Sequence, residues 1–224
     1  MVVMLQLLKL FCQLLLFVSS VALGHAEPML ADDTLPAALS CPIAKAYDQD
    51  HIPVYFLHHQ FPDGSQDLVI AIHESAAEPD IKRVTFSSGG PDCLAKYLAI
   101  ARGGNWGWHL LWQPEGTSVL RYARMDGEAW VTSPAKKLAT QAHPVNQPLI
   151  LTLGQQVWVV WIEIGGAINN IYAVYSDDEG RNWQEARLIA QTGKVPSSLS
   201  LIEKENIPYL AGQGLAEPLP LLSK

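Results

Sequence analysis

The stretch SDDEGRNW, residues 176–183, follows the pattern S-x-D-x-G-x-x-W and comes directly after the apolar run NIYAVYS (170–176). Asp and Ser side chains can accept hydrogen bonds from backbone N–H groups a few residues further on, which fixes a tight turn. Glycine permits a positive φ, and tryptophan offers a large apolar face that can pack under such a turn. A calcium loop would place its carboxylates at alternate positions, whereas the three acidic residues here are consecutive. We therefore interpret the turn as structural, with its frame formed by Ser176, Asp178, Gly180 and Trp183.

The turn belongs to a repeat that becomes visible when the flanking sequence is included. Residues 104–139 align with residues 154–190, at a period of about 50 residues. The matched groups are Leu110-Leu111-Trp112 with Val159-Val160-Trp161, Arg121-Tyr122-Ala123 with Ile171-Tyr172-Ala173, and Gly127–Trp130 with Gly180–Trp183. The earlier copy of the turn, MDGEAW, is shorter and degenerate: it keeps Gly127 and Trp130 and has Met125 where the Asp should be. Four short strands repeated at this period are typical of a β-propeller blade.

The rest of the chain indicates an all-β fold. Short runs rich in Val, Ile, Leu, Tyr and Trp predict antiparallel strands at 54–59, 67–73, 108–113, 118–125, 148–154, 157–164 and 170–176. Residues 196–214 resemble the opening half of another unit, and residues 51–90 contain strands but no clear Asp-rich turn. We therefore predict a β-propeller-like domain at 51–224, with about three and a half to four four-stranded blades. Three alternatives are open: a small closed propeller, an incomplete propeller that closes as a homodimer, and a β-sandwich-like arrangement.

Residues 1–26 have the layout of a secretory signal peptide. One positive charge, Lys9, precedes an apolar run from Leu10 to Leu23, and small residues follow it. An uncleaved membrane anchor is the alternative, although polar residues interrupt this segment. No later segment is long and apolar enough to suggest a membrane span. We expect an exported protein, periplasmic or extracellular, with an N-terminal extension at 27–50 before the domain.

Charge and cysteine content narrow the expected partners. The net charge of the chain is −7 and the leader contains no Asp or Glu, so the mature part is acidic. Nucleic acid and anionic lipid are therefore poor partners. Cys12 is removed with the leader, which leaves Cys41 and Cys93. Two cysteines in an exported chain favour a disulfide between them, and two free thiols are the alternative.

The S-x-D-x-G-x-x-W pattern resembles the Asp box, the short repeat of sialidases and related β-propeller proteins. The match at 176–183 is complete, and the resemblance extends over residues 93–214. In that family the box joins the outer two strands of a blade, on the side away from the ligand. The resemblance therefore implies that the box has a structural role and that any ligand binds on the opposite side of the blades.

The same resemblance raises the question of catalysis. Sialidases use three Arg side chains that bind the substrate carboxylate, a Tyr nucleophile assisted by a Glu, and an Asp acid/base. The first of these Arg residues lies in an Arg-Ile-Pro motif, whereas this chain reads His51-Ile52-Pro53. The remaining catalytic candidates are Arg83, Arg102 and Tyr97. We therefore favour a non-catalytic module that binds a glycan or a protein. The alternatives are a divergent exo-sialidase or glycoside hydrolase acting on acidic sugars, and an assembly factor for an envelope complex.

Tryptophans near the start of the repeat offer a candidate glycan contact. Trp106 and Trp108 lie at alternate positions, so they share one face of a strand and could stack on sugar rings. Core packing is the alternative, because the nearby Trp112 aligns with Trp161 of the repeat. No nucleotide-binding or zinc motif is present in the sequence, so we expect no cofactor and no metal.

Overall fold

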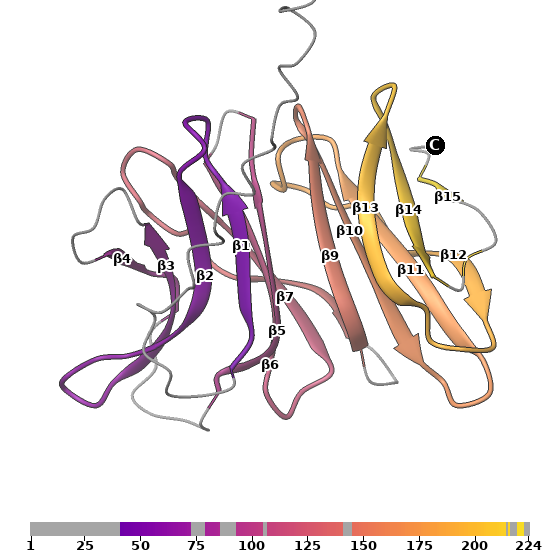
Figure 1. Ribbon diagram of the computed structural model, residues 1–224, viewed down its shortest axis with the longest axis horizontal. Coiled ribbons are helices and arrows are strands. Elements are labelled where there is room, and N and C mark those ends of the chain that lie inside the picture. The colour runs from indigo at the N-terminus through magenta and orange to yellow at the C-terminus, as the bar shows by residue number, and fades with distance from the viewer. Residues whose placement is uncertain are drawn as a thin grey trace, which may run out of the picture. The chain divides into compact units, whose positions relative to one another are not determined.

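The computed structural model describes residues 41–72, 79–85, 93–104, 107–140, 145–213, 215 and 219–221. These residues contain no helix, and their antiparallel strands make four sheets (Figure 1), which confirms the prediction of an all-β fold. In this described part, accordingly, there is no helix that could cross a membrane. Three sheets have four strands and the last has three, all paired in the order of the chain. Each sheet is therefore an antiparallel meander, in which each strand pairs with the next strand of the chain.

The strands divide among the sheets as follows. The first sheet contains β1 (Ile43–Tyr47), β2 (Pro53–Gln60), β3 (Gln66–Ile72) and β4 (Asp80–Arg83). The second sheet contains β5 (Ala95–Arg102), β6 (Trp108–Pro114), β7 (Val119–Met125) and β8 (Lys136–Thr140). The third sheet contains β9 (Val145–Leu153), β10 (Gln156–Ile164), β11 (Asn169–Ser176) and β12 (Arg187–Thr192). The fourth sheet contains β13 (Ser197–Lys204), β14 (Ile207–Gln213) and β15 (Leu219–Pro220).

The domain begins earlier than the sequence predicted. β1 pairs with β2 along its whole length, from Ile43 opposite Leu57 to Tyr47 opposite Pro53. Part of the expected extension at 27–50 is therefore a strand of the first sheet. The prediction missed it because IAKAY is short and carries two alanines and a lysine, which are poor strand formers.

Consecutive sheets bury apolar side chains between them. Among the described residues, one cluster lies between the first and second sheets, one between the second and third, and one between the third and fourth. The opening strands of the sheets also lie side by side, since β1 contacts β5, β5 contacts β9 and β9 contacts β13. Each sheet thus packs against the sheet that precedes it and the sheet that follows it in the chain.

Burial on both faces explains the unbroken apolar sequences of the middle strands. In β10, Val159 and Trp161 face the second sheet, whereas Trp158 and Val160 face the fourth. A strand with one face in water would alternate apolar and polar residues instead. The repeat had aligned Trp112 with Trp161, and both side chains are buried in clusters, 3% and 1% exposed.

The pairing registers correct one part of that repeat alignment. Trp108 pairs with Met125 in the second sheet, and Val157 pairs with Ser176 in the third. Met125 therefore stands in the place of Ser176 rather than of Asp178, and the alignment of β7 with β11 is wrong by one residue. The Tyr-Ala dipeptide common to both strands misled the alignment. A slip of one residue reverses the face on which every side chain lies.

A disulfide ties the first two sheets together. The Sγ atoms of Cys41, just before β1, and Cys93, just before β5, are bonded at 2.04 Å. In a chain-entropy treatment, the bond lowers the conformational entropy of the unfolded chain. For a loop of this length, the effect stabilises the folded protein by about 4 kcal/mol. The bond therefore holds together the two sheets between which the candidate site lies.

Candidate functional site

The S-x-D-x-G-x-x-W turn of the third sheet, residues 176–183, is held by hydrogen bonds among its own residues. Ser176 Oγ accepts the N–H of Gly180 at 2.8 Å and donates to Asp178 Oδ1 at 2.7 Å. Asp178 Oδ1 also accepts the N–H of Asn182 at 2.8 Å. Desolvation acts to raise the pKa of Asp178, but the hydrogen bonds from Asn182 and Ser176 outweigh it and lower the pKa to about 2. The residues in this turn thus do what their sequence pattern predicts.

This turn also docks on the second sheet. The ring of Trp183 packs edge-to-face against Tyr122 of β7, with 4.8 Å between centroids. Gly180 has a φ of +77°, and a Cβ at this position would lie 1.8 Å from Tyr122 Oη. Arg124 donates to the carbonyl oxygen of Glu179 at 3.4 Å. Only glycine therefore fits between the turn and the neighbouring sheet.

A buried histidine lies behind this contact. His109 of β6 and Tyr122 share a hydrogen bond of 2.6 Å between Nδ1 and Oη, and both residues are 1% exposed. Burial, with a smaller contribution from the charge of Arg124, lowers the pKa of His109 to about 4. Burial also raises the pKa of Tyr122. The pair is uncharged at neutral pH and belongs to the core between the second and third sheets.

The degenerate turn of the second sheet has kept its carboxylate. Asp126 Oδ1 accepts the N–H of Glu128 at 2.9 Å and of Ala129 at 2.6 Å. Trp130 follows with a φ of +55°, which is unusual for a residue with a side chain. Asp126 therefore holds this turn as Asp178 holds the other. The alignment of the two repeats missed the role of Asp126 because this turn is two residues shorter and β7 had been aligned out of register.

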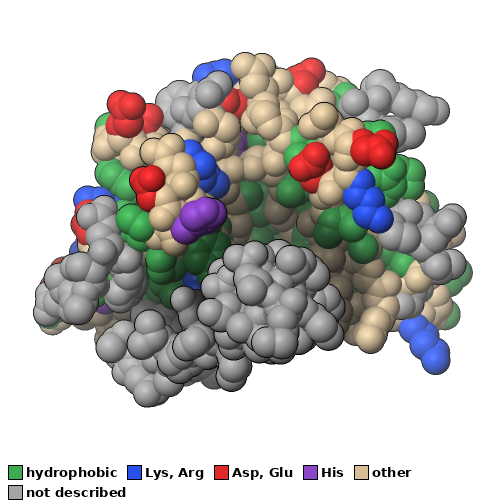
Figure 2. Space-filling model, turned by 45° about the horizontal axis from the view of Figure 1, so that its top comes forward, with side chains coloured by type: hydrophobic (Ala, Val, Ile, Leu, Met, Phe, Trp, Pro, Cys, Tyr) green, Lys and Arg blue, Asp and Glu red, His purple; other side chains and the backbone are tan. Residues whose placement is uncertain are grey.

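A cavity of about 310 Å³ opens beside this second turn, between the first and second sheets. Its lining includes residues of the β1–β2, β5–β6 and β7–β8 turns, which lie at the upper end of the sheets in Figure 1. Figure 2 shows this end of the molecule, where acidic and basic side chains lie close together around hydrophobic ones. The cavity is lined by Asp48, Gln49, Val54, Ile72, Arg102, Gly103, Gly104, Gly107, Trp108, Gly127, Glu128 and Trp130.

Arg102 supplies the cation of this cavity. Its Nη2 donates to Gln49 Oε1 at 3.2 Å, and within the described ranges no carboxylate lies close enough to form an ion pair with it. Asp48 approaches from the same turn as Gln49, and its Oδ1 accepts the N–H groups of Asp50 and Ile52 at 2.8 Å each. The guanidinium is therefore positioned by a neutral amide and retains donors that can bind a ligand.

The backbone beneath Arg102 is closely packed. Thr152 of β9 donates to the carbonyl oxygen of Arg102. A Cβ on Gly103 would lie 2.6 Å from His109 Nε2, and one on Gly104 would lie 2.9 Å from the carbonyl oxygen of Gly154. The glycines thus let the β5–β6 turn fit between its neighbours and leave peptide groups rather than side chains facing the cavity.

The catalytic candidates do not come together. Arg83 of β4 forms an ion pair with the buried Asp67 at 3.1 Å and stacks on Phe61 of the β2–β3 turn, 3.7 Å from the ring centroid. That turn lies at the end of the sheets opposite the cavity (Figure 1). Tyr97 and Arg102 are five positions apart on β5, which places their side chains on opposite faces and toward opposite ends of the strand. Only Arg102 reaches the cavity.

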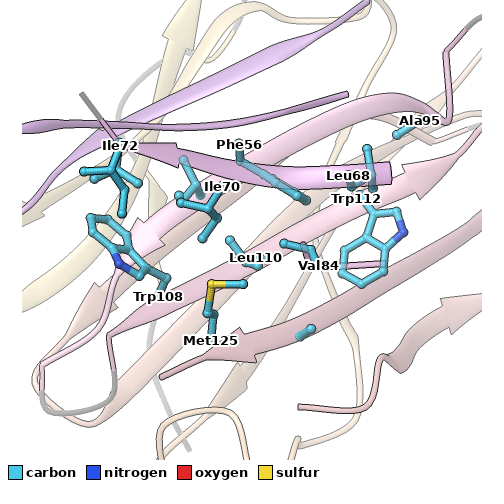
Figure 3. Close-up of a cluster of buried hydrophobic side chains, with 13 residues drawn as sticks. Phe56, Leu68, Ile70, Ile72, Val84, Ala95, Trp108, Leu110, Trp112 and Met125 are labelled. Carbon is cyan, nitrogen blue, oxygen red and sulfur yellow. The ribbon is translucent and has the colours of Figure 1, made fainter. Parts of the chain in front are cut away.

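The tryptophan row is not a stacking surface. Trp106 lies outside the described residues. Trp108 is 3% exposed and packs beside Ile72 and Met125 (Figure 3), so its ring faces are covered and only part of the side chain borders the cavity. Trp108 therefore belongs to the core, as the core-packing alternative predicted, and is not an exposed sugar contact. Trp130, which the sequence suggested only as part of a structural turn, is the half-buried aromatic residue of the cavity.

Several cavity residues had no signal strong enough to identify them in advance. Asp48 and Gln49 belong to a short polar turn, and Glu128 to a turn read only as a degenerate box. The clearest signal was the glycine-rich stretch 103–107, because closely spaced glycines mark places where backbone approaches backbone.

Comparison with known proteins does not assign the chain to a family: no family model matches it, and no curated protein matches it.

Proposed function

We propose that the protein is an exported, non-catalytic binding protein of the Asp-box kind, in which the four sheets are blades of a β-propeller-like domain. The meander order of the sheets, the contacts among their opening strands and the carboxylate-held turns after β7 and β11 support this assignment. A closed ring is not part of the proposal, because three clusters among the described residues join four sheets in succession.

We place the ligand in the cavity between the first and second sheets, and propose that it is a carbohydrate. The observation that carries this proposal is the combination of Arg102, the carboxylates of Asp48 and Glu128 and the indole of Trp130 around one cavity. Small-molecule sites combine an apolar wall with a few polar groups, and about 300 Å³ is the lower end of their usual size. Sugar hydroxyls both donate and accept hydrogen bonds, and a sugar ring can lie against an aromatic face.

The separation of Arg83, Arg102 and Tyr97 gives no support to a sialidase-type hydrolase, so we do not put catalysis forward as a second function. The cavity also lies at the end of the sheets that carries the Asp-box turns. The family resemblance had implied a ligand at the opposite end. The proposed site is therefore distinct from the one that the resemblance suggested.

The proposal is tested by screening the purified chain against a panel of charged and uncharged mono- and oligosaccharides. Saturation-transfer NMR would detect binding, and titration calorimetry would measure it. Binding should be lost in Arg102→Ala and weakened in Trp130→Gly. Arg121→Ala, which removes an exposed cation from β7 away from the cavity, is the matched control and should bind normally. If no sugar binds, or if Arg102→Ala binds as well as the parent protein, the proposed function is wrong.

A further inference from the structure

The charges around the cavity bear on which class of sugar it can accept. The residues that line the cavity include one guanidinium, Arg102, and two carboxylates, Asp48 and Glu128. Their formal charges sum to a net negative site, on a chain whose net charge is already −7. A ligand that brings its own carboxylate would gain one ion pair with Arg102 but would also meet two like charges, which disfavour it at this range.

The polar groups fit hydroxyl groups better than they fit a carboxylate. Arg102 Nη2 donates to the amide oxygen of Gln49 at 3.2 Å, and the guanidinium keeps further N–H groups that can donate to a ligand. The carboxylates of Asp48 and Glu128 can only accept hydrogen bonds when ionised, and a sugar hydroxyl can donate to them. A ring with several hydroxyls thus has partners of both kinds.

One wall of the cavity suits the face of an uncharged ring. Trp130 provides an aromatic surface, and Lys82 Nζ lies 5.9 Å from its ring centroid. Gly107 and Gly127 also line the cavity, and a Cβ on Gly107 would lie 2.3 Å from the backbone nitrogen of Gly127. Neither residue carries a side chain, so a ligand can approach their peptide groups.

From these three features we infer that the cavity binds an uncharged pyranose in preference to an acidic sugar. This inference rests on the proposed binding function of the same cavity. It departs from the acidic substrates that the Asp-box resemblance implies, and it assigns separate roles to the lining groups: Arg102 donates to ring hydroxyls, Glu128 and Asp48 accept from them, and Trp130 covers a ring face.

A matched pair of ligands isolates the charge. Methyl glucoside and methyl glucuronide share one ring and differ at C6, where the second carries a carboxylate; the galactose pair extends the comparison. Titration calorimetry of the whole chain at pH 7 should give at least about tenfold tighter binding of the uncharged member of the better-bound pair. Glu128→Gln should reduce this discrimination several-fold, and Glu128→Lys should bring the uronide to equal or tighter binding. Arg121→Gln is the control and should leave the ratio unchanged.

The outcomes separate the two proposals. Binding of the uronide as tight as or tighter than that of the glucoside, lost in Arg102→Ala, overturns the preference for uncharged sugars and leaves the binding function intact. Discrimination that does not change in Glu128→Gln and Glu128→Lys also overturns the inference, because the selectivity would then not come from the lining charges. If neither member of either pair binds and the wider sugar panel also fails, both proposals fall.

Discussion

The turns that follow β7 and β11 occupy the same place in their sheets and have opposite surroundings. In both, one Asp carboxylate accepts backbone N–H groups of the turn, Asp126 in the second sheet and Asp178 in the third. The turn of the third sheet is packed against Tyr122, whereas the turn of the second sheet borders the cavity. A turn-forming carboxylate common to both turns therefore does not determine whether a turn packs against a neighbouring sheet or borders a cavity.

The difference comes from what each turn meets. Glu179 is 3% exposed, and its N–H donates to the carbonyl oxygen of Gln155 in the adjacent β9–β10 turn. Glu128, at the tip of the other turn, is exposed, and Val131 just beyond it is 65% exposed. The longer turn covers its neighbouring sheet, and the shorter turn leaves a space beside the first sheet. Each of the following predictions tests this contrast.

The largest expected effect comes from the two tryptophans. Trp183→Ala removes a ring packed against a buried tyrosine, and we expect it to lower the free energy of unfolding by about 4 kcal/mol. Trp130→Gly removes a half-buried ring that packs against the first core cluster and borders the cavity, but it also relieves a positive φ, so we expect a smaller loss of about 1–2 kcal/mol. Urea unfolding of both variants would measure the difference. Equal losses would contradict the contrast between a buried and an open turn.

The buried pair behind the third-sheet turn predicts a pH dependence of stability. His109 has a folded pKa of about 4, below its usual value of about 6.5 in an unfolded chain, because burial disfavours the charged imidazole. The contribution of the neutral His109 side chain to stability is fully present above about pH 6.5, where the imidazole is neutral in both the folded and the unfolded protein. As the pH falls from 6.5 toward 4, the unfolded state takes up a proton that the folded state refuses, and stability falls by about 3 kcal/mol in all.

The variant His109→Gln keeps an acceptor for Tyr122 and removes the titration. Urea unfolding between pH 7 and 5, above the range in which most carboxylates titrate, should therefore show a shallower slope in the variant. Burial also lowers the pKa values of His58 and His59, so part of the slope remains in any case. Identical slopes in the two proteins would mean that His109 titrates normally and that the core behind the turn is open to water.

The sequence predicted the central strands and both turns because these depend on local chemistry. The predicted runs 157–164 and 170–176 fall almost exactly on β10 and β11, whose apolar residues are continuous and whose ends carry turn residues. The frame of this turn could likewise be assigned, since the hydrogen bonds that Ser176 and Asp178 form in it lie within residues 176–183. Strands with weaker composition, such as β1, were missed.

The cavity could not be predicted, because its walls come from turns far apart in the chain. Arg102 and Gln49 are 53 residues apart in sequence, and no local pattern indicates that they meet. The alignment error at β7 has a related cause. Strand register is set by pairing across the sheet, whereas a sequence alignment compares residues only along the chain. That error hid the role of Asp126, which corresponds to that of Asp178.

The smallest expected effect separates the two carboxylates. Asp178→Asn weakens hydrogen bonds from Ser176 and Asn182 in a partly buried turn, and we expect a loss of about 1 kcal/mol at pH 7. Asp126→Asn, in a turn whose N–H groups are exposed, should cost about half as much, because water can replace the lost acceptor.

The folded pKa of Asp178, about 2, lies below its ordinary value, so its charge stabilises the fold above about pH 3.8 and this contribution is lost as the pH falls toward 2. The stability difference between the parent protein and Asp178→Asn should accordingly shrink across that window, measured by thermal unfolding in steps of pH. A difference that stays constant to pH 2 would mean that the charge of Asp178 contributes nothing and that the docked turn is held by packing on Tyr122 alone.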